Sequence, residues 1–507
     1  MQNLEWALKK RLWNALIVLK FRLNKPRRIP KPTSTRRPIK RIPIAQHHSS
    51  IQIKEILVAD YIPSDEKAWS HLIFTKFQYM LYRYFPPKVR GLPSIDSDPM
   101  TALDLAYGPG HRKCLHAPII PDEYKEPIDL GALAVAGPYF CYLQDGNDGR
   151  YKWNLSQLND YEHHPGLHRL GVEVSFEFDK GAGRLKAVEI DCELGRCTPA
   201  DPEWELAQKI ALCSVTTHLS LVRHFVGIHL ALVAQFAITT RNKLPVNHCL
   251  RRLLWAHVWG TQYSNELVSN ILMGKGGDFE EIFSLTHKGL CDLFASSYKH
   301  YDIGVLDPES DAERRGIRNR GFDLPALKNR VAHWKVIHEH ARRYLELYYK
   351  SDQDLREDAA IKAWLNDLNH YIPNGVDELL GDKLTVEGMA KLVAAYIYAG
   401  TVEHEAVGTG MWNYQLWTHV QPVRIYKNGR REPVDLYQRL VNYNFILNVS
   451  RAPLLQDLSY LAGNDQAGAV AFSTFLAELA DLQAHLKAES DECWKLHPAD
   501  LEVSVNS

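Results

Sequence analysis

Residues 214–257 read SVTTHLSLVRHFVGIHLALVAQFAITTRNKLPVNHCLRRLLWAH, and this stretch decides the fold. From Leu219 to Ala237 it is mostly apolar and helix-forming, interrupted by Arg223, His224 and His229. Such a run predicts a buried helix rather than a surface helix. Two imidazoles inside a buried helix are costly to leave unpaired, so both histidines need partners. A metal ion and ordinary hydrogen-bonding groups are the two candidates.

The spacing of the two histidines sets a geometric condition. Residues five apart on a regular α-helix project about 140° apart, which is too far round to share one ion. His224 and His229 point the same way only if the helix is locally widened, as in a π-bulge, and π-bulges are frequent at functional sites. Gly227 lies between them and would ease that distortion.

The residues that follow resemble the core of the lipoxygenase family. HFVGIH (224–229) is followed by LPVNHCLRRLLWAH (244–257) and by GKGGDFEEIF (274–283), in the order of that family's first metal-binding helix, conserved-histidine segment and Gly-Gly turn. Further along, YLELYYKSDQDLRED (344–358) is similar to the family's arched-helix region, TVEHEAVG (401–408) to its second metal-binding helix, and LEVSVNS (501–507) to its chain end. The resemblance is close over residues 170–507 and loose over 45–170.

The resemblance implies a mainly α fold, a large helical bundle around two long metal-binding helices. Residues 1–45 form a basic amphipathic segment and a Pro/Arg-rich linker, and 46–507 form the catalytic domain. The family's preceding lipid-binding β-barrel domain is not expected in this chain. Alternation over 172–178 and 185–190 around a Gly-rich turn predicts a β-hairpin near 171–194. A helical core follows over 204–507, whereas 86–150 has many Pro and Gly residues and no long periodicity, which indicates irregular structure.

The resemblance also implies a mononuclear non-haem Fe(II)/Fe(III) or Mn centre. The matching ligands are His224, His229, His404 and the terminal carboxylate of Ser507, and Gly408 stands at the variable fourth-ligand position. Imidazole and carboxylate donors without thiolate suit such an ion. An ordinary frayed terminus is the alternative for Ser507.

Several matching positions depart from the family pattern. Gly408 has no side chain to offer, and Ser220 and Met411 replace two amides that connect the substrate helix to the metal site. Groups behind the ligands orient them and tune the metal, so the chemistry itself is open to change. His248 and His257 match family histidines outside the ligand set and are expected to be structural.

The matching substrate-channel positions are apolar, and a plain helix core would contain the same residues: Val268, Leu272, Phe279, Ile282 and Phe283. Val268 stands where the family usually has Ala or Gly, a choice connected with oxygen access. Arg424, Arg430 and Arg431 are candidates for pairing a fatty-acid carboxylate, since Arg binds carboxylates through two donors. Solvated surface charge is the alternative reading of these arginines.

Formal charge is zero over 507 residues, but residues 1–45 hold thirteen Lys or Arg against the single acid Glu5. Residues 1–24 mix these cations with Trp and Leu, which is compatible with an interfacial helix on anionic lipid, with a helix docked on the protein, or with a targeting segment. The eight cysteines form no CxxC pair, which indicates free thiols in a reducing compartment. The sequence contains no run of about 18 uncharged apolar residues, so it predicts no membrane-spanning helix.

The resemblance implies a lipoxygenase-type dioxygenase that inserts O2 into polyunsaturated fatty acids or related lipids to give hydroperoxides. Two alternatives remain open. One is the same fold with altered chemistry, a hydroperoxide isomerase or the oxidation of a non-fatty-acid metabolite. The other is a metal-poor lipid-binding protein. We expect a cytoplasmic monomer, peripheral to membranes if residues 1–24 bind them, with no nucleic-acid partner.

Overall fold

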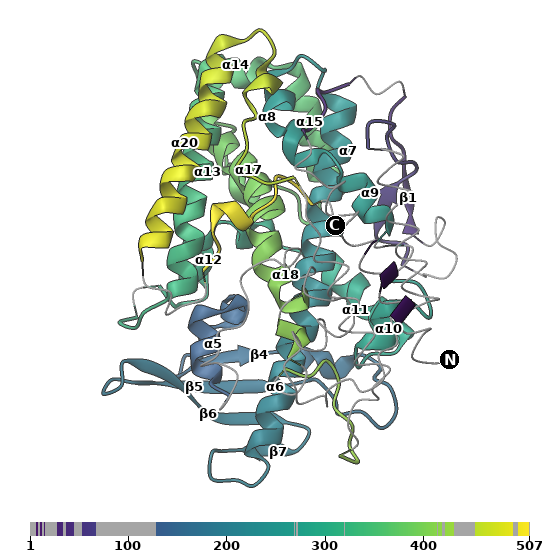
Figure 1. The fold of residues 1–507 in the computed structure, drawn as a ribbon, viewed down its shortest axis with the longest axis vertical. Helices are drawn as coiled ribbons and strands as arrows, with labels where there is room; N and C mark the ends of the chain where they lie inside the picture. The colour runs from purple at the N-terminus through teal and green to yellow at the C-terminus, as the bar shows by residue number, and fades with distance from the viewer. Residues whose placement is uncertain are drawn as a thin grey trace.

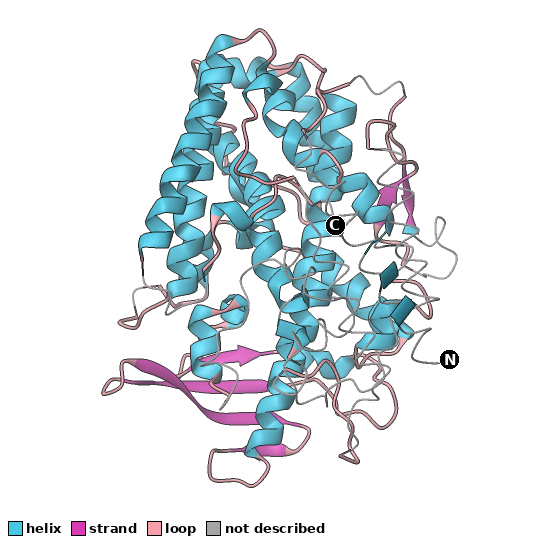
Figure 2. Ribbon diagram, in the orientation of Figure 1, coloured by secondary structure: helices cyan, strands magenta, loops and turns pink. Residues whose placement is uncertain are grey.

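The computed structural model describes residues 28–33, 37–44, 53–66, 128–267, 269, 272–318, 320–412, 414–417, 421–429, 452–489 and 495–505, with five further positions at 7, 8, 11, 12 and 15. It is mainly helical, with a five-stranded sheet at one end of the molecule and a separate two-stranded sheet (Figure 1; Figure 2). The predicted fold class is therefore confirmed.

The sheet is an antiparallel meander in the order β3-β4-β5-β6-β7. Its longest strands are the predicted hairpin, β5 (Glu173–Asp179) and β6 (Arg184–Cys192), with a register shift at Ser175/Phe176. The sheet is larger than predicted because β3 (Gln144–Asp145), β4 (Tyr151–Asn154) and β7 (Gly195–Cys197) extend it.

Residues 130–145 are ordered, so the expectation of irregular structure over 86–150 is wrong there. They form helix α5 (Leu130–Ala136), the 3-10 turn η3 (Pro138–Tyr142) and strand β3. Asp129 caps α5 through the Ala132 N–H, and Leu130, Leu133 and Ala134 are buried. This segment is stabilised by the packing of α5 against β6. A short helix held by tertiary packing shows no long periodicity in the sequence.

One continuous helix passes through the centre of the protein. It consists of α6 (Trp204–His218), the π-helical segment η5 (Leu219–Val233) and α7 (Ala234–Lys243). By length and composition alone this 40-residue helix could cross a membrane, but 89% of its most apolar window is buried inside the fold. It is the helix around which the core is built.

A second composite helix packs against the first. It consists of α17 (Val386–Tyr398), the π-helical segment η8 (Ala399–Glu403) and α18 (His404–Trp412). Two long antiparallel helices, α13 (Pro325–Tyr348) and α20 (Gln466–Ala488), lie along its outer side (Figure 1). The other α-helices in the described residues are α8 (Cys249–Val258), α9 (Thr261–Leu267), α10 (Asp278–Ile282), α11 (His287–Lys299), α12 (Pro308–Arg314), α14 (Asp352–Glu357), α15 (Ala359–Tyr371) and α16 (Asp377–Leu380).

The described part of the Pro/Arg-rich stretch is docked on the helical body and is not a free linker. The Trp255 indole donates to the Pro30 carbonyl at 2.6 Å, and the Arg251 guanidinium donates to the Thr33 carbonyl at 2.8 Å. Ile29 is buried beneath this segment. Strand β1 (Arg41–Pro43) then pairs with β2 (Leu57–Ala59). Apolar burial and these hydrogen bonds fix this part of the stretch to the body.

Two further expectations find partial answers. The six cysteines that the structure describes carry free thiols. Only five positions of residues 1–24 are described, and among them Leu8 and Leu12 are 58% and 53% exposed. The choice between membrane contact and docking for that segment stays a prediction.

Candidate metal centre

Three buried histidines from the two composite helices converge on one point. One ring nitrogen from each of His224, His229 and His404 lies within 4.8 Å of the others. The His229 Nε2 atom is 3.3 Å from the Nε2 atoms of both His224 and His404. All three side chains are at most 2% exposed.

The π-helical backbone explains why the first pair can share a point. Along η5 the chain is wound more widely, and at its end the Ala234 N–H donates to the His229 carbonyl five residues earlier. In a helix of this kind residues five apart lie close together on one face. The condition set by the His224–His229 spacing is thus met, and η8 repeats the same winding immediately before His404.

The outer nitrogen atoms of two rings meet side-chain oxygens. His229 Nδ1 is 3.3 Å from Asn265 Oδ1 of α9, and His404 Nδ1 is 3.3 Å from Glu405 Oε1. Phe225 stacks on the His229 ring with centroids 5.1 Å apart. These contacts hold the rings so that their Nε2 atoms face one another.

The arrangement suits a metal ion. Nitrogen ligands sit about 2.1 Å from a first-row ion of this type, so two of them at angles of about 90–110° lie roughly 3.0–3.4 Å apart. The 3.3 Å separations of the Nε2 atoms fall in that range. Imidazole donors fit iron and several neighbouring metals, so ligation by these three histidines stays the prediction that the geometry favours.

The apolar positions expected along a channel lie beside this cluster. Phe279 contacts Phe225 edge-on at 4.5 Å between centroids and also lies beside Phe283 at 6.0 Å. Leu272, Ile282 and Phe283 are buried with it in the main core. Val268 lies outside the described residues. A channel role for these residues stays a prediction, since each is also a core residue.

The position of Gly408 follows from the helix that carries His404. It is buried and lies four residues later on α18. Side chains four apart on an α-helix share one face, so a side chain at 408 would face the histidine cluster. Because glycine has no side chain, position 408 offers no donor atom to the histidine cluster.

The loss of the amide connection is only partial. Met411 belongs to α18, and nothing further is described of its side chain. Gln415, four residues later in the 3-10 turn η9 (Tyr414–Leu416), donates from Nε2 to Ser220 Oγ at 2.8 Å. An amide therefore still joins the second composite helix to η5. The role of Gln415 was not predicted from the sequence. Its only signal there is that it lies one helical turn after Met411.

The C-terminal tail is buried as far as the structure describes it. The Val503 N–H donates to the Ala452 carbonyl at 3.0 Å, and Ser504 Oγ donates to the Trp259 carbonyl at 2.8 Å. Val505 lies against Gly400 of η8, where a Cβ atom at Gly400 would stand 4.0 Å from Val505 Cγ2. Ser507 lies outside the described residues. The tail thus reaches the helical turn before His404, and ligation by the terminal carboxylate remains a prediction.

His248 and His257 occupy structural positions. His248 Nε2 is 3.1 Å from Asp358 Oδ2, and its Nδ1 accepts the Leu250 N–H as the cap of α8. His257 Nδ1 lies 2.6 Å from the Val503 carbonyl and so holds the C-terminal tail. Burial lowers the pKa of His257 to about 4, so this ring is neutral and donates to the carbonyl.

Arg424 is half-buried and bonds to the backbone at the end of α10. Its Nε atom donates to the Ile282 carbonyl at 2.9 Å, and Nη2 donates to the Glu281 carbonyl. The guanidinium thus caps the end of α10. Pairing of Arg424 with a fatty-acid carboxylate stays a prediction. Arg430 and Arg431 lie outside the described residues.

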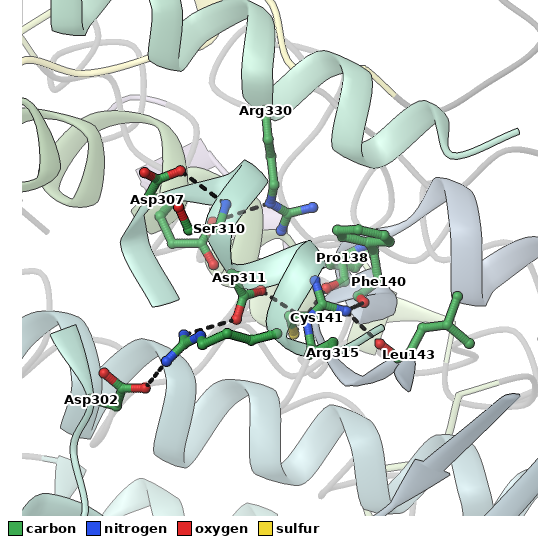
Figure 3. Close-up of polar contacts among 12 residues, drawn as sticks. Pro138, Phe140, Cys141, Leu143, Asp302, Asp307, Ser310, Asp311, Arg315 and Arg330 are labelled. Atoms are coloured by element: carbon green, nitrogen blue, oxygen red, sulfur yellow. Dashed lines mark hydrogen bonds and ion pairs between the residues drawn. The ribbon is translucent and has the colours of Figure 1, made fainter. Parts of the chain in front are cut away.

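A buried charge cluster lies behind His404, and it was not anticipated. We use this name for Arg330, Glu403, Asp311 and Arg315, with the exposed Arg314 at its rim. Arg330 Nε donates to Glu403 Oε2 at 3.2 Å, and Asp311 pairs with Arg315 at 2.8 Å and with Arg314 at 3.3 Å. Arg315 also donates to the Phe140 and Leu143 carbonyls (Figure 3). The cluster ties α12, α13 and η3 to the turn that carries His404.

Comparison with known proteins gives consistent matches. The lipoxygenase family model matches residues 160–444, more than half of the chain. A linoleate 9S-lipoxygenase 2 of Oryza sativa is 25% identical over 323 residues, covering 56% of this chain and 37% of the relative. The chain thus spans little more than a third of that relative's length.

Solved structures share the fold. A calcium-dependent 11R-lipoxygenase superposes with a TM-score of 0.74 at 16% identity, covering 92% of this chain and 80% of the other. The manganese lipoxygenase of Gaeumannomyces graminis superposes with a TM-score of 0.61 at 14% identity, covering 71% and 70%.

Proposed function

Since the chain belongs to the lipoxygenase family, we propose that it is a dioxygenase that inserts O2 into polyunsaturated fatty acids or related lipids to give hydroperoxides. The observation that carries this proposal is the convergence of His224, His229 and His404 within 4.8 Å inside an apolar core. The matched rice relative is a linoleate enzyme, so linoleate is the first substrate to test.

The proposed cofactor is non-haem iron, with manganese as the alternative, since a manganese enzyme shares the fold. His224, His229 and His404 would hold the ion, with the Ser507 carboxylate as a further ligand. When bound, such an ion supplies the one-electron chemistry that removes a hydrogen atom from a bis-allylic methylene. The protein supplies position and environment.

The residues around the cluster prepare it for that chemistry. Asn265 and Glu405 fix the outer nitrogen atoms of His229 and His404, so the rings are oriented before substrate arrives. Phe225 and Phe279 cover the cluster with apolar surface and exclude water from it. A fatty-acid chain would pack against that surface, where an apolar pocket suits an apolar ligand.

Gly408 favours a second candidate on the same fold. With no side-chain donor at position 408, an ion at the three histidines would keep one more position for solvent or substrate. The candidate activities are isomerisation of hydroperoxides and oxidation of a metabolite that is not a fatty acid. We further propose a cytoplasmic monomer, which would be peripheral to membranes if residues 1–24 bind them.

The test combines metal analysis with two activity assays. Purified protein is expected to hold about one iron or manganese per chain, to consume O2 with linoleate and to form conjugated diene. His404→Ala is expected to lose most of the metal and the activity, whereas the exposed His485→Ala is the matched control and should lose neither. Stoichiometric metal with decomposition of added hydroperoxide but no diene would favour the second candidate. No bound metal in the unmodified chain would contradict both.

A further inference from the structure

A cavity lies on the face of η5 turned away from the histidine cluster. Its volume is about 330 Å³, and none of His224, His229 or His404 lines it. We call it the rear cavity. Residues of η5, of α11, of the 3-10 turn η7 (Ile303–Leu306) and Glu403 of η8 form its walls. Its volume lies at the small end of the range for small-molecule pockets.

The apolar part of the rear cavity is formed by Val222, Val226, Ile228, Leu293, Val305 and Leu306. Tyr301 packs against η5, since a Cβ atom at Gly227 would stand 3.5 Å from one edge of the Tyr301 ring. The Tyr301 carbonyl accepts a hydrogen bond from Asn374 at 2.8 Å, which fixes the residue in place. This wall suits a short hydrocarbon group.

Arg223 is the cation of the rear cavity that no described ion pair holds. Of the cavity's carboxylates, Glu403 is paired with Arg330 at 3.2 Å, and Asp302 shares Arg314 with Glu378, at 2.6 Å and 3.1 Å. Arg223 lines the same cavity and forms no ion pair with any residue in the described part of the chain, while the carboxylates of Glu403 and Asp311 act on it from a greater distance. The site therefore offers a guanidinium that no described carboxylate contacts directly, beside an apolar wall.

Two neutral polar groups accompany Arg223. The Tyr301 side chain is 8% exposed, and its hydroxyl is buried with no hydrogen-bond partner among the described residues. An unpartnered buried hydroxyl is unfavourable, and Tyr301 is among the residues that line the cavity. His218 bonds to the Tyr142 hydroxyl through Nδ1 at 2.9 Å. Burial and the nearby Arg223 lower the pKa of His218 to about 3, so it adds no charge near pH 7.

We propose that the rear cavity binds a small organic carboxylate with a short hydrocarbon group. Arg223 pairs with the carboxylate, Tyr301 donates its hydroxyl proton to a carboxylate oxygen, and the hydrocarbon packs against Val222, Val226 and Leu293. Arg223 and Glu403 directly precede His224 and His404 in the chain, so an occupant contacts the turn before two of the clustered histidines. This binding does not depend on the proposed oxygenase activity.

The test is titration calorimetry of the full-length protein with hexanoate, and with hexan-1-ol as the uncharged probe of the same length. Hexanoate is expected to bind measurably more tightly than the alcohol. Arg223→Gln is expected to weaken hexanoate binding about tenfold or more, because a charge-assisted contact is lost. Tyr301→Phe removes only the hydroxyl, leaves the ring on Gly227, and is expected to weaken binding by about threefold.

Arg342→Gln is the matched control, since this arginine lies on the surface and pairs with Glu339 and Glu346; it should bind hexanoate like the unmodified protein. Equal binding of the two probes, or unchanged hexanoate binding in the Arg223→Gln and Tyr301→Phe proteins, would overturn the proposal. If the Arg223→Gln protein does not fold, the hexanoate affinity of the Tyr301→Phe protein alone tests the proposal. Calorimetry of protein stripped of metal measures hexanoate binding without any oxygenase activity. Its result therefore does not depend on whether the oxygenase proposal is correct.

Discussion

Gln415 donates a hydrogen bond of 2.8 Å from Nε2 to Ser220 Oγ, and both side chains are fully buried. The bond joins the turn after α18 to the start of η5, so it connects the helix of His404 with the helix of His224 and His229. This hydrogen bond replaces the amide connection between the two helices. We expected that connection to be missing because Ser220 and Met411 stand at the two amide positions.

Replacing Ser220 by alanine tests that connection. The change leaves the Gln415 amide buried without its acceptor, so we expect the free energy of unfolding to fall by about 1–3 kcal/mol. Urea unfolding followed by circular dichroism measures it. Ser473→Ala on the exposed side of α20 is the control and should change stability by less than about 0.5 kcal/mol. Equal stability of the Ser220→Ala and unmodified proteins would show that the bond contributes nothing.

Gly408→Asn is expected to tighten metal binding. The asparagine oxygen would share a face of α18 with His404 and would add a donor to the three imidazoles. We expect slower loss of the ion to a chelator, measured as residual metal against time. Ser473→Asn, on the exposed side of α20, is the control for introducing an asparagine. Faster loss from the Gly408→Asn protein would mean that α18 has no room for the side chain.

His340 predicts a loss of stability in acid. Its ring is fully buried, stacks on Phe475 at 4.1 Å between centroids, and has no hydrogen-bond partner among the described residues. Burial, and then the neighbouring His257 and Arg343, lower its pKa to about 3. The ordinary value in the unfolded chain is about 6.5.

The unfolded state therefore takes up a proton below pH 6.5 while the folded state does not, so stability falls as pH drops from about 6.5 toward 3. One such histidine costs about 2 kcal/mol between pH 7 and pH 5. His340→Phe is expected to remove that part of the pH dependence and to raise stability at pH 5. Unfolding curves at both pH values measure it, with the exposed His485→Phe as control. An unchanged pH slope would show that His340 is protonated in the folded protein.

Arg330 predicts a large effect within the buried charge cluster. Arg330→Met leaves Glu403 buried without its cation, and breaking a buried pair in this way costs about 3–5 kcal/mol. The surface pair of Arg342 and Glu339 is the comparison, and Arg342→Met should cost less than about 1 kcal/mol. Adding Glu403→Gln to Arg330→Met should recover part of the loss, which a double-mutant cycle in urea would measure.

The sequence predicted most of what local rules determine. The i,i+5 spacing of His224 and His229 required a widened helix, and alternation over 172–190 located the β5–β6 hairpin. Helix α6 begins at Trp204, where the helical pattern begins. In each case the signal is the periodicity or spacing of neighbouring residues, which secondary structure reflects directly.

Contacts between distant segments were beyond that reasoning. The pairing of Glu403 with Arg330 joins residues 73 positions apart, and Gln415 and Ser220 are 195 positions apart. Arg424 read as a surface charge because nothing nearby indicates that it caps α10. Strands β3 and β4 were missed for a related reason, since they are short and become favourable only beside β5.

The docked segment at residues 28–44 bears on how this protein is trimmed for study. Ile29 supplies a carbonyl to the Tyr460 hydroxyl at 2.8 Å, while Pro30 and Thr33 serve Trp255 and Arg251. A shortened chain that starts after residue 44 would uncover an indole N–H, a guanidinium and a phenol together. A truncation from the N-terminus should therefore keep residues 28–44, because a cut within them removes these contacts with the folded body.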